Sequence, residues 1–225
     1  MSITREISLV TALILVSDLQ IHTAPFDYGV DMGANLRHTW GWDDDVWNHI
    51  YKQYPFMQGI GVAPTLLRPK SRGSVTLGGP GIYDPPTIDT NFLDHPDDVD
   101  TLVNGLKFVK KLEETDAFKK YDMRVVQDQM LCGDNLNPDS DEYYQKFARE
   151  YLTTVYHPVG TCAMGPCSRT SVVDHRLRVH GIGNLRVVDA SVMPRLVGGN
   201  TNATCVMIGE KAASMIIADE KENTK

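Results

Sequence analysis

The residue of this chain best suited to accept a proton from an alcohol is His157. It stands in the run YHPVGTCAMG at residues 156–165, where a helical pattern gives way to a turn. Oxidation of an alcohol by hydride transfer needs a base for the hydroxyl proton, and histidine titrates near neutral pH. Pro158 and Gly160 would fix the backbone of this turn. A histidine in a turn can equally be structural, so the residue type alone leaves both interpretations open.

A second polar group that could orient a substrate oxygen is Asn200, in the run GGNTNAT at residues 198–204. The two glycines before it allow the backbone to approach a ligand closely. The apolar residues that follow predict a buried helix over residues 203–218, with Asn202 as its cap. The positive end of that helix would favour a negative charge developing over the loop. The alternative is a capped core helix that follows an ordinary loop.

A metal site is another possible use of this region, because two histidines and two cysteines lie close together in the sequence. They are His157, Cys162, Cys167 and His175. Common zinc sites space their ligands in tight pairs, and these residues fit no such pattern. We therefore expect no metal ion.

The composition is that of a globular protein with a substantial core: 225 residues, 42% hydrophobic and 23% charged. The formal charge of −7 argues against a nucleic-acid partner or an anionic membrane surface, since phosphate binding needs clustered lysine and arginine. A small neutral substrate fits this charge better. The four cysteines are too few and too irregularly spaced to predict a disulfide framework, so the compartment stays open.

The amino-terminal segment has some features of a secretion signal. Arg5 precedes an apolar run at residues 7–16, but no small-x-small cleavage site follows it. The run is too short to span a bilayer, and residues 17–22 alternate as a half-buried strand does. We favour a buried helix or strand end over a cleaved signal.

Periodicity and turn residues predict a mixed α/β (α+β) fold. Trp40, Trp42 and Trp47 lie in a long loop, where they pack into a core or, alternatively, form a sugar-stacking platform. Residues 78–86 are rich in glycine and proline, so regular structure stops there. The remaining predicted strands cover residues 60–67, 74–77 and 185–189, and the other predicted helices cover 45–51, 96–112 with an amphipathic tail to 120, and about 139–154.

With these segments in order, the chain resembles the carboxyl-terminal part of the glucose-methanol-choline (GMC) oxidoreductases, and insect-type glucose dehydrogenases most. The resemblance extends over about two thirds of the chain and is strongest from about residue 65. The matching segments are RPKSRGSVTL at 68–77, DTNFLDHPDDVDTLVNGLK at 89–107, YHPVGTCAMG at 156–165, SVVDHRLRVHGIGNLRVVDASVMP at 171–194 and GGNTNATCVMIGEKAA at 198–213.

The resemblance implies a role for each matching site residue. His157 corresponds to the family's active-site histidine, and Asn200 stands where relatives carry histidine or asparagine as the second catalytic residue. Asp189 and Ala190 correspond to a segment that touches the diphosphate region of FAD. The backbone stretch beside the flavin ring corresponds to Thr201, Asn202 and Ala203. In this family FAD accepts hydride from an alcohol or sugar, and oxygen, a quinone or another acceptor then takes the electrons.

The resemblance also implies a domain arrangement. Residues 1–180 would form a substrate-binding domain, an antiparallel sheet covered by helices, and residues 181–225 would return to a Rossmann-like FAD-binding domain as a strand, a loop and the final helix. The dinucleotide fingerprint Gly-x-Gly-x-x-Gly is not present, and the nearest run, at 181–186, ends in arginine. We therefore expect the chain to act only with a missing amino-terminal half, and to expose apolar surface without it. The alternative is a truncated, non-catalytic fragment. Secretion is plausible for the family.

Overall fold

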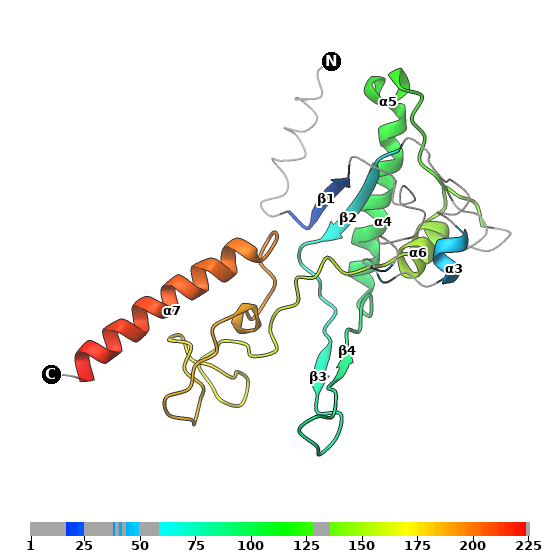
Figure 1. Ribbon diagram of the computed structural model, residues 1–225. Coiled ribbons are helices and arrows are strands. Elements are labelled where there is room, and N and C mark those ends of the chain that lie inside the picture. Colours follow the sequence, from blue (N-terminus) through cyan, green and yellow to red (C-terminus); the bar gives the residue numbers. More distant parts are fainter. Residues whose placement is uncertain are drawn as a thin grey trace. The chain divides into compact units, whose positions relative to one another are not determined.

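The computed structural model describes residues 17–24, 38, 41, 44–49, 59–127 and 136–223 (Figure 1). The apolar run at 7–16, together with Trp40, Trp42 and Cys132, lies outside the described residues. The chain divides into two compact units: unit 1 takes in Met1–Leu66 and Leu93–Thr154, and unit 2 takes in Leu67–Phe92 and Val155–Lys225. Each unit combines helices with a small antiparallel sheet, which confirms the mixed class. The domain boundary at residue 180 stays a prediction.

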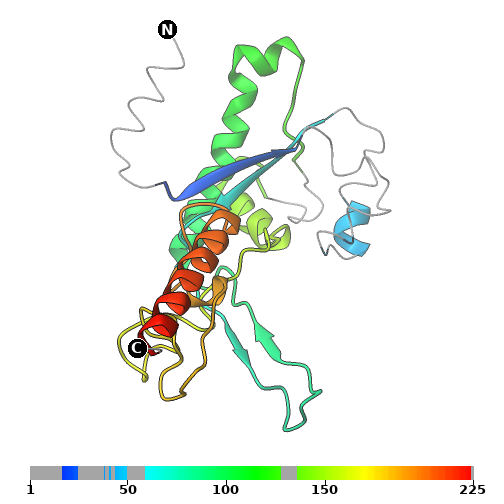
Figure 2. The same ribbon diagram turned by 60° about the vertical axis from the view of Figure 1, so that its left-hand side comes forward.

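The sheet of unit 1 consists of two antiparallel strands, β1 (Leu19–Ala24) and β2 (Gly61–Leu66). Their register pairs Leu19 with Leu66 and Ala24 with Gly61, and the strands lie side by side in both views (Figures 1 and 2). Both strands were predicted to within about two residues. The short helix α3 (Asp44–His49) was also predicted, and its Trp47 is buried, as a core aromatic should be.

Helix α4 (Pro96–Lys111) begins where the sequence indicates. His95 caps it, because its Nδ1 accepts a hydrogen bond from the backbone N–H of Asp97 at 3.2 Å, and Pro96 occupies the first turn. The predicted amphipathic tail to residue 120 does not continue α4. A 3-10 turn, η2 (Leu112–Glu114), ends the helix, and the Thr115 hydroxyl caps a new helix, α5 (Asp116–Lys120).

The core of unit 1 lies between α4 and α6 (Asp141–Glu150). Ser140 caps α6 by accepting from the Tyr143 N–H at 3.2 Å, as its position predicts, but the helix ends four residues before the predicted Thr154. Its buried face and that of α4 share one apolar cluster. The cluster comprises Leu93, Val99, Leu102, Val103, Tyr143, Tyr144 and Ala148.

A buried glycine, Gly105, sets how closely α4 packs on the sheet of unit 1. A Cβ added there would lie 2.8 Å from the Cβ of Pro64 and 3.1 Å from Cδ1 of Leu19. Alanine would gain about 1 kcal/mol of helix propensity. Overpacking against a proline ring should cost more, about 1–3 kcal/mol. We therefore expect Gly105→Ala to lower the free energy of unfolding, measured by denaturant titration of tryptophan fluorescence, because all three tryptophans belong to unit 1.

The matched control is the same substitution in an open helical position. Gly209 lies in α7 (Asn202–Asn223), and a Cβ there meets nothing within 4 Å. Gly209→Ala should therefore stabilise its helix by up to about 1 kcal/mol, as followed by far-ultraviolet circular dichroism. If Gly105→Ala proved as stable as the parent, the close packing of α4 on the sheet would not depend on the absence of a side chain at position 105.

Unit 2 contains the hairpin of β3 (Ser74–Thr76) and β4 (Thr87–Asp89), a 3-10 turn η3 (Ala190–Val192), and α7. The predicted strand at 74–77 is present, whereas β4 was not predicted. The core of this unit gathers residues from the loops at 173–193 onto one face of α7. It comprises Val173, Leu177, Val192, Met193, Ile208 and Ala212.

Two predictions for the secondary structure of unit 2 need correction. Residues 185–189 do not form a strand: an extended segment needs a paired neighbour, and here only Arg186 makes an isolated bridge, with Arg178. The predicted cap also shifts by one residue, because the helix begins at Asn202 and the carbonyl of Thr201 accepts its first bond, from the Cys205 N–H at 2.9 Å.

Helix α7 is buried on only one narrow face. Ile208 and Ala212 are buried, whereas Val206, Met207 and Ile217 are each more than half exposed. The prediction of a buried helix is therefore wrong for this chain by itself. The exposed face agrees with the expectation that the chain alone shows apolar surface there.

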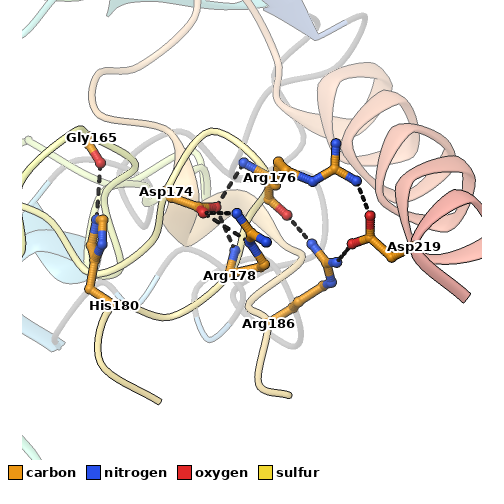
Figure 3. Close-up of polar contacts among 7 residues, drawn as sticks. All are labelled: Gly165, Asp174, Arg176, Arg178, His180, Arg186 and Asp219. Carbon is orange, nitrogen blue, oxygen red and sulfur yellow. Dashed lines mark hydrogen bonds and ion pairs between the residues drawn. The ribbon is translucent and has the colours of Figure 1, made fainter. Parts of the chain in front are cut away.

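Two ion pairs connect the carboxyl-terminal part of α7 to the preceding loops (Figure 3). The Asp219 carboxylate accepts hydrogen bonds from the guanidinium groups of Arg176 and Arg186, and Arg186 also donates to the carbonyl of Arg176. Within the same loop, the Asp174 carboxylate accepts from the backbone N–H groups of Arg176 at 2.8 Å and Arg178 at 2.9 Å. Together these bonds fix the loop that packs under the helix.

This cluster predicts a loss of stability at low pH. Partial burial would raise the pKa of Asp219, but the hydrogen bonds and charges of Arg186 and Arg176 outweigh it and lower the pKa below its usual value. A carboxylate with a lowered folded-state pKa stabilises the fold above its unfolded pKa, about 4, and this contribution is lost as the pH falls through the folded value. Asp219→Asn should lower the melting temperature at neutral pH.

The difference between Asp219→Asn and the parent should shrink as the pH falls below about 4. Melting curves by circular dichroism at a series of pH values test this. Glu222→Gln is the control, because Glu222 is an exposed carboxylate on the same helix and its replacement should leave the melting temperature nearly unchanged. A gap that stayed constant from neutral to acid pH would contradict the role of the carboxylate charge.

Candidate active site

Two residues predicted to act together, His157 and Asn200, are in direct contact in unit 2. Nδ2 of Asn200 lies 2.7 Å from Nε2 of His157, although the residues are 43 positions apart in the sequence. Asn200 is exposed and His157 is half-buried, so the pair is open to a small molecule. An amide and an imidazole that meet in this way can share a substrate hydroxyl.

The other side of the imidazole contacts Thr201. Oγ1 of Thr201 lies 2.8 Å from Nδ1 of His157, and Thr201 is only 6% exposed. Both ring nitrogens are therefore engaged, one by an exposed amide and one by a buried hydroxyl. The sequence places Thr201 next to Asn200, but it gives no sign that the threonine side chain meets the histidine.

The turn after His157 is held by backbone hydrogen bonds to the segment around η3. The N–H of Cys162 donates to the carbonyl of Ser191 at 3.0 Å, and the N–H of Met164 donates to the carbonyl of Val192 at 2.9 Å. Gly160 adopts a φ of 93°, in the region that favours glycine. Two of the five segments that carry the family resemblance, 156–165 and 171–194, are thus hydrogen-bonded to each other, and this pairing fixes the position of the turn that holds His157.

Tyr156 directly precedes the histidine and has an unusual backbone conformation. Its φ is 61°, in the left-handed region that residues with a Cβ seldom adopt. Because this conformation is costly in isolation, the hydrogen-bonded turn that follows it must hold it there. The turn is therefore a fixed platform for His157.

Helix α7 starts immediately beside this pair. Asn202 and Ala203 are exposed in its first turn, where backbone N–H groups have no partner within the helix. A Cβ on Gly199 would meet nothing within 4 Å, and the Arg68 guanidinium lies 3.8 Å from the Cβ position of Gly198. The helix start thus presents donors and space, with a cation nearby that the sequence analysis did not single out.

The predicted diphosphate-contacting residues, Asp189 and Ala190, lie at η3. Oδ1 of Asp189 accepts from the N–H of Ser191 at 2.8 Å and also from the Ser191 hydroxyl, so the carboxylate caps this turn. Ala190 packs against the apolar core of unit 2. Asp189 thus shapes the loop, and any contact with an anionic group would come from the backbone around it.

A second histidine of unit 2, His180, is not comparable with His157. Nε2 of His180 lies 3.0 Å from the carbonyl oxygen of Gly165, as Figure 3 shows. A carbonyl only accepts, so this nitrogen carries a proton. It cannot act as a base toward the Ser171 hydroxyl, 3.3 Å away, so the pair is structural.

Other kinds of site find no support among the residues that the structure describes. Over residues 59–127 and 136–223 and the shorter described ranges, no three His, Cys, Asp or Glu side chains gather as metal ligands would. Cys162, Cys167 and Cys205 are free thiols. In the same part of the chain, no helix combines the length and apolar character that a membrane span requires.

The comparison with known families decides the assignment. Residues 69–209 match the family model described as GMC oxidoreductase. The chain belongs to the GMC oxidoreductase family. Glucose dehydrogenase [FAD, quinone] of Drosophila pseudoobscura pseudoobscura is 41% identical over 160 residues, which are 71% of this chain and 26% of the relative. Alcohol dehydrogenase [acceptor] of Pseudomonas putida is 42% identical over 151 residues, 67% of this chain and 26% of the relative.

Solved structures agree with this assignment. A fungal aryl-alcohol oxidase aligns with a TM-score of 0.61 at 32% identity and covers 73% of this chain and 26% of that chain. A formate oxidase aligns with a TM-score of 0.60 at 31% identity, with coverages of 72% and 27%. The chain spans about a quarter of the length of the curated relatives it matches.

Proposed function

We propose that this chain supplies the His157–Asn200 side of the active site of an FAD-dependent oxidoreductase that acts on the CH–OH group of an alcohol or sugar. The observation that carries the proposal is the 2.7 Å contact between Asn200 Nδ2 and His157 Nε2, beside the start of α7. Membership of the GMC family supports the reaction class, and the relatives' names supply the candidate donors.

The residues present fit a flavin. The exposed first turn of α7, at Asn202 and Ala203, offers N–H donors and the positive helix end to an anionic ring edge. With Thr201, these residues would hold the flavin ring through their backbone. Asp189 and Ala190 would lie near the diphosphate, and the Asp189 carboxylate is turned to the N–H of Ser191.

In the proposed reaction, Nε2 of His157 accepts the hydroxyl proton of the substrate. Asn200 Nδ2, which contacts the same nitrogen in the structure, would give up that contact when substrate binds and donate to the substrate oxygen, which fixes the oxygen beside the base. Bound FAD would accept the hydride that leaves the carbon, and oxygen or a quinone would then take the electrons. The enclosed position of Thr201 keeps water from the Nδ1 side of the imidazole.

The dinucleotide fingerprint is missing from these 225 residues, so we propose that the chain works only as part of a longer polypeptide or with a complementary one. A second candidate is a non-catalytic fragment that holds no FAD. The exposed apolar face of α7, with Val206, Met207 and Ile217, does not distinguish the two candidates. A partner domain could cover it in the enzyme, and a second copy could cover it in the fragment.

The visible spectrum tests these proposals. The 225-residue chain and the longest polypeptide encoded by its gene would be purified, and the flavin absorption band recorded before and after anaerobic addition of alcohols and sugars. We expect the band in the longer polypeptide, bleached by one class of donor, and a colourless short chain. If every form were colourless, the non-catalytic fragment would be the better description.

A further inference from the structure

The two hydrogen bonds of His157 together determine which ring nitrogen carries the proton. Nε2 faces Nδ2 of Asn200 at 2.7 Å, and Nδ1 faces Oγ1 of Thr201 at 2.8 Å. An amide nitrogen carries two hydrogens and only donates, so Nε2 must accept. A neutral imidazole has one protonated and one unprotonated nitrogen. The proton of neutral His157 therefore lies on Nδ1, which donates to the threonine hydroxyl.

Thr201 is well placed to hold that tautomer. Its carbonyl accepts the first hydrogen bond of α7, from the Cys205 N–H at 2.9 Å, so its backbone is fixed at the helix start. Its branched side chain has few rotamers and is almost fully buried. A threonine in this position commonly caps the helix with its hydroxyl. Here the hydroxyl is 2.8 Å from the imidazole instead.

We propose that Thr201 is a positioning residue that keeps His157 protonated at Nδ1 and so leaves Nε2 unprotonated, with its lone pair toward Asn200 until a substrate hydroxyl takes the place of the amide. The inference deepens the proposed function, because the tautomer matters for catalysis only if His157 is the base. The tautomer itself is a property of this chain. It can therefore be measured without flavin or substrate.

His180 offers an internal contrast. Its Nε2 lies 3.0 Å from the Gly165 carbonyl, an acceptor, so that ring is protonated at Nε2. The two half-buried histidines of unit 2 should thus show opposite tautomers. This contrast makes a single spectrum of the parent protein informative before any variant is made.

The experiment is nitrogen NMR of the 225-residue chain with ¹⁵N-labelled histidine, at a pH where the rings are neutral. His157→Gln and His180→Gln identify the two sets of signals. In the parent we expect an Nδ1–H, Nε2-unprotonated pattern for His157 and the reverse for His180. A His157 ring protonated at Nε2 would overturn the proposal.

The variants test whether Thr201 is the cause. Thr201→Ser keeps the hydroxyl and should retain the parent pattern, whereas Thr201→Val keeps the shape and should give a mixture of tautomers. Thr170→Val is the matched control, because Thr170 is an exposed threonine whose hydroxyl bonds a carbonyl away from the imidazole. An unchanged pattern in Thr201→Val would also overturn the proposal. If Thr201→Val does not fold, Thr201→Ala replaces it as the variant without a hydroxyl, and the tautomer of His157 in the parent still tests the proposal.

The same variants separate this inference from the proposed function. If the tautomers are as expected but no form of the protein oxidises an alcohol, Thr201 positions His157 and the proposed function is wrong. If the protein oxidises alcohols, Thr201→Val should lower kcat more than it changes KM, and Thr201→Ser should restore kcat. Full activity of Thr201→Val, with the tautomer unchanged, would refute the positioning role.

Discussion

Replacement of His157 by alanine in the flavin-bound protein is expected to slow alcohol-dependent reduction of the flavin by about 10²–10⁴-fold. The reason is that Nε2 of His157, 2.7 Å from Asn200 Nδ2, is the basic nitrogen placed to take the hydroxyl proton. The Thr201 hydroxyl and the Asn200 amide, which contact the ring, are not bases at neutral pH and could not replace it. Anaerobic stopped-flow absorbance in the presence of excess alcohol measures this rate directly.

The control for His157→Ala is His175→Ala, which removes an exposed histidine of the same unit. Flavin reduction by that variant should match the parent. Both variants should keep the parent's flavin absorption before substrate is added, because the cofactor contacts proposed here come from the start of α7 and from η3. If His157→Ala retained the parent rate, the assignment of the base would be wrong and a different residue would have to accept the proton.

The sequence predicted local structure best where a chemical signal marks the boundary. Pro96 and its acidic neighbours set the start of α4, and Ser140 sets the start of α6. The break between α4 and α5 had such a signal too, because Thr115 precedes an acidic first turn, but the long amphipathic pattern masked it. A local cap thus ends a helix even where the amphipathic pattern of the sequence continues.

Strand pairing was harder to predict because it depends on distant residues. β4 is a three-residue, exposed strand whose existence rests on its pairing with β3. Gly73, just before β3, is the sequence feature that could have indicated this pairing. A Cβ there would lie 2.2 Å from the carbonyl oxygen of Asp89, so the close approach of the two chains requires glycine. Residues 185–189 show the opposite case, a strand-like composition with almost no pairing in this chain.

For the site, the sequence and the family resemblance selected the residues, and the structure supplied their mutual arrangement. His157 and Asn200 were expected in one pocket, and they touch. The hydroxyl of Thr201 was not expected to bond the imidazole, because spacing along the chain says nothing about which way a side chain turns at a helix start. Their chemical roles stay predictions until the variants are measured.

The second large effect is expected from Asn200→Asp, which changes a single group of atoms. A carboxylate accepts hydrogen bonds and cannot donate, so Nε2 of His157 would have to carry a proton. Nδ1 would still donate to Thr201, 2.8 Å away, and the adjacent negative charge would favour the doubly protonated ring. The base would then be lost, and we expect flavin reduction at neutral pH to slow by about 10²–10³-fold.

Asn200→Ala separates the loss of the donor from the arrival of a charge. Alanine removes the amide but leaves the lone pair of Nε2 available, so the rates should fall in the order parent, Asn200→Ala, Asn200→Asp. Asn200→His, which introduces the alternative residue that the family resemblance implies for this position, should retain more activity than Asn200→Asp because an imidazole N–H can still donate. In the chain alone, nitrogen NMR of Asn200→Asp should show both nitrogens of His157 protonated. An Asn200→Asp variant as fast as Asn200→Ala would mean that the negative charge adds nothing to the loss of the amide donor, and the expected protonation of Nε2 would be wrong.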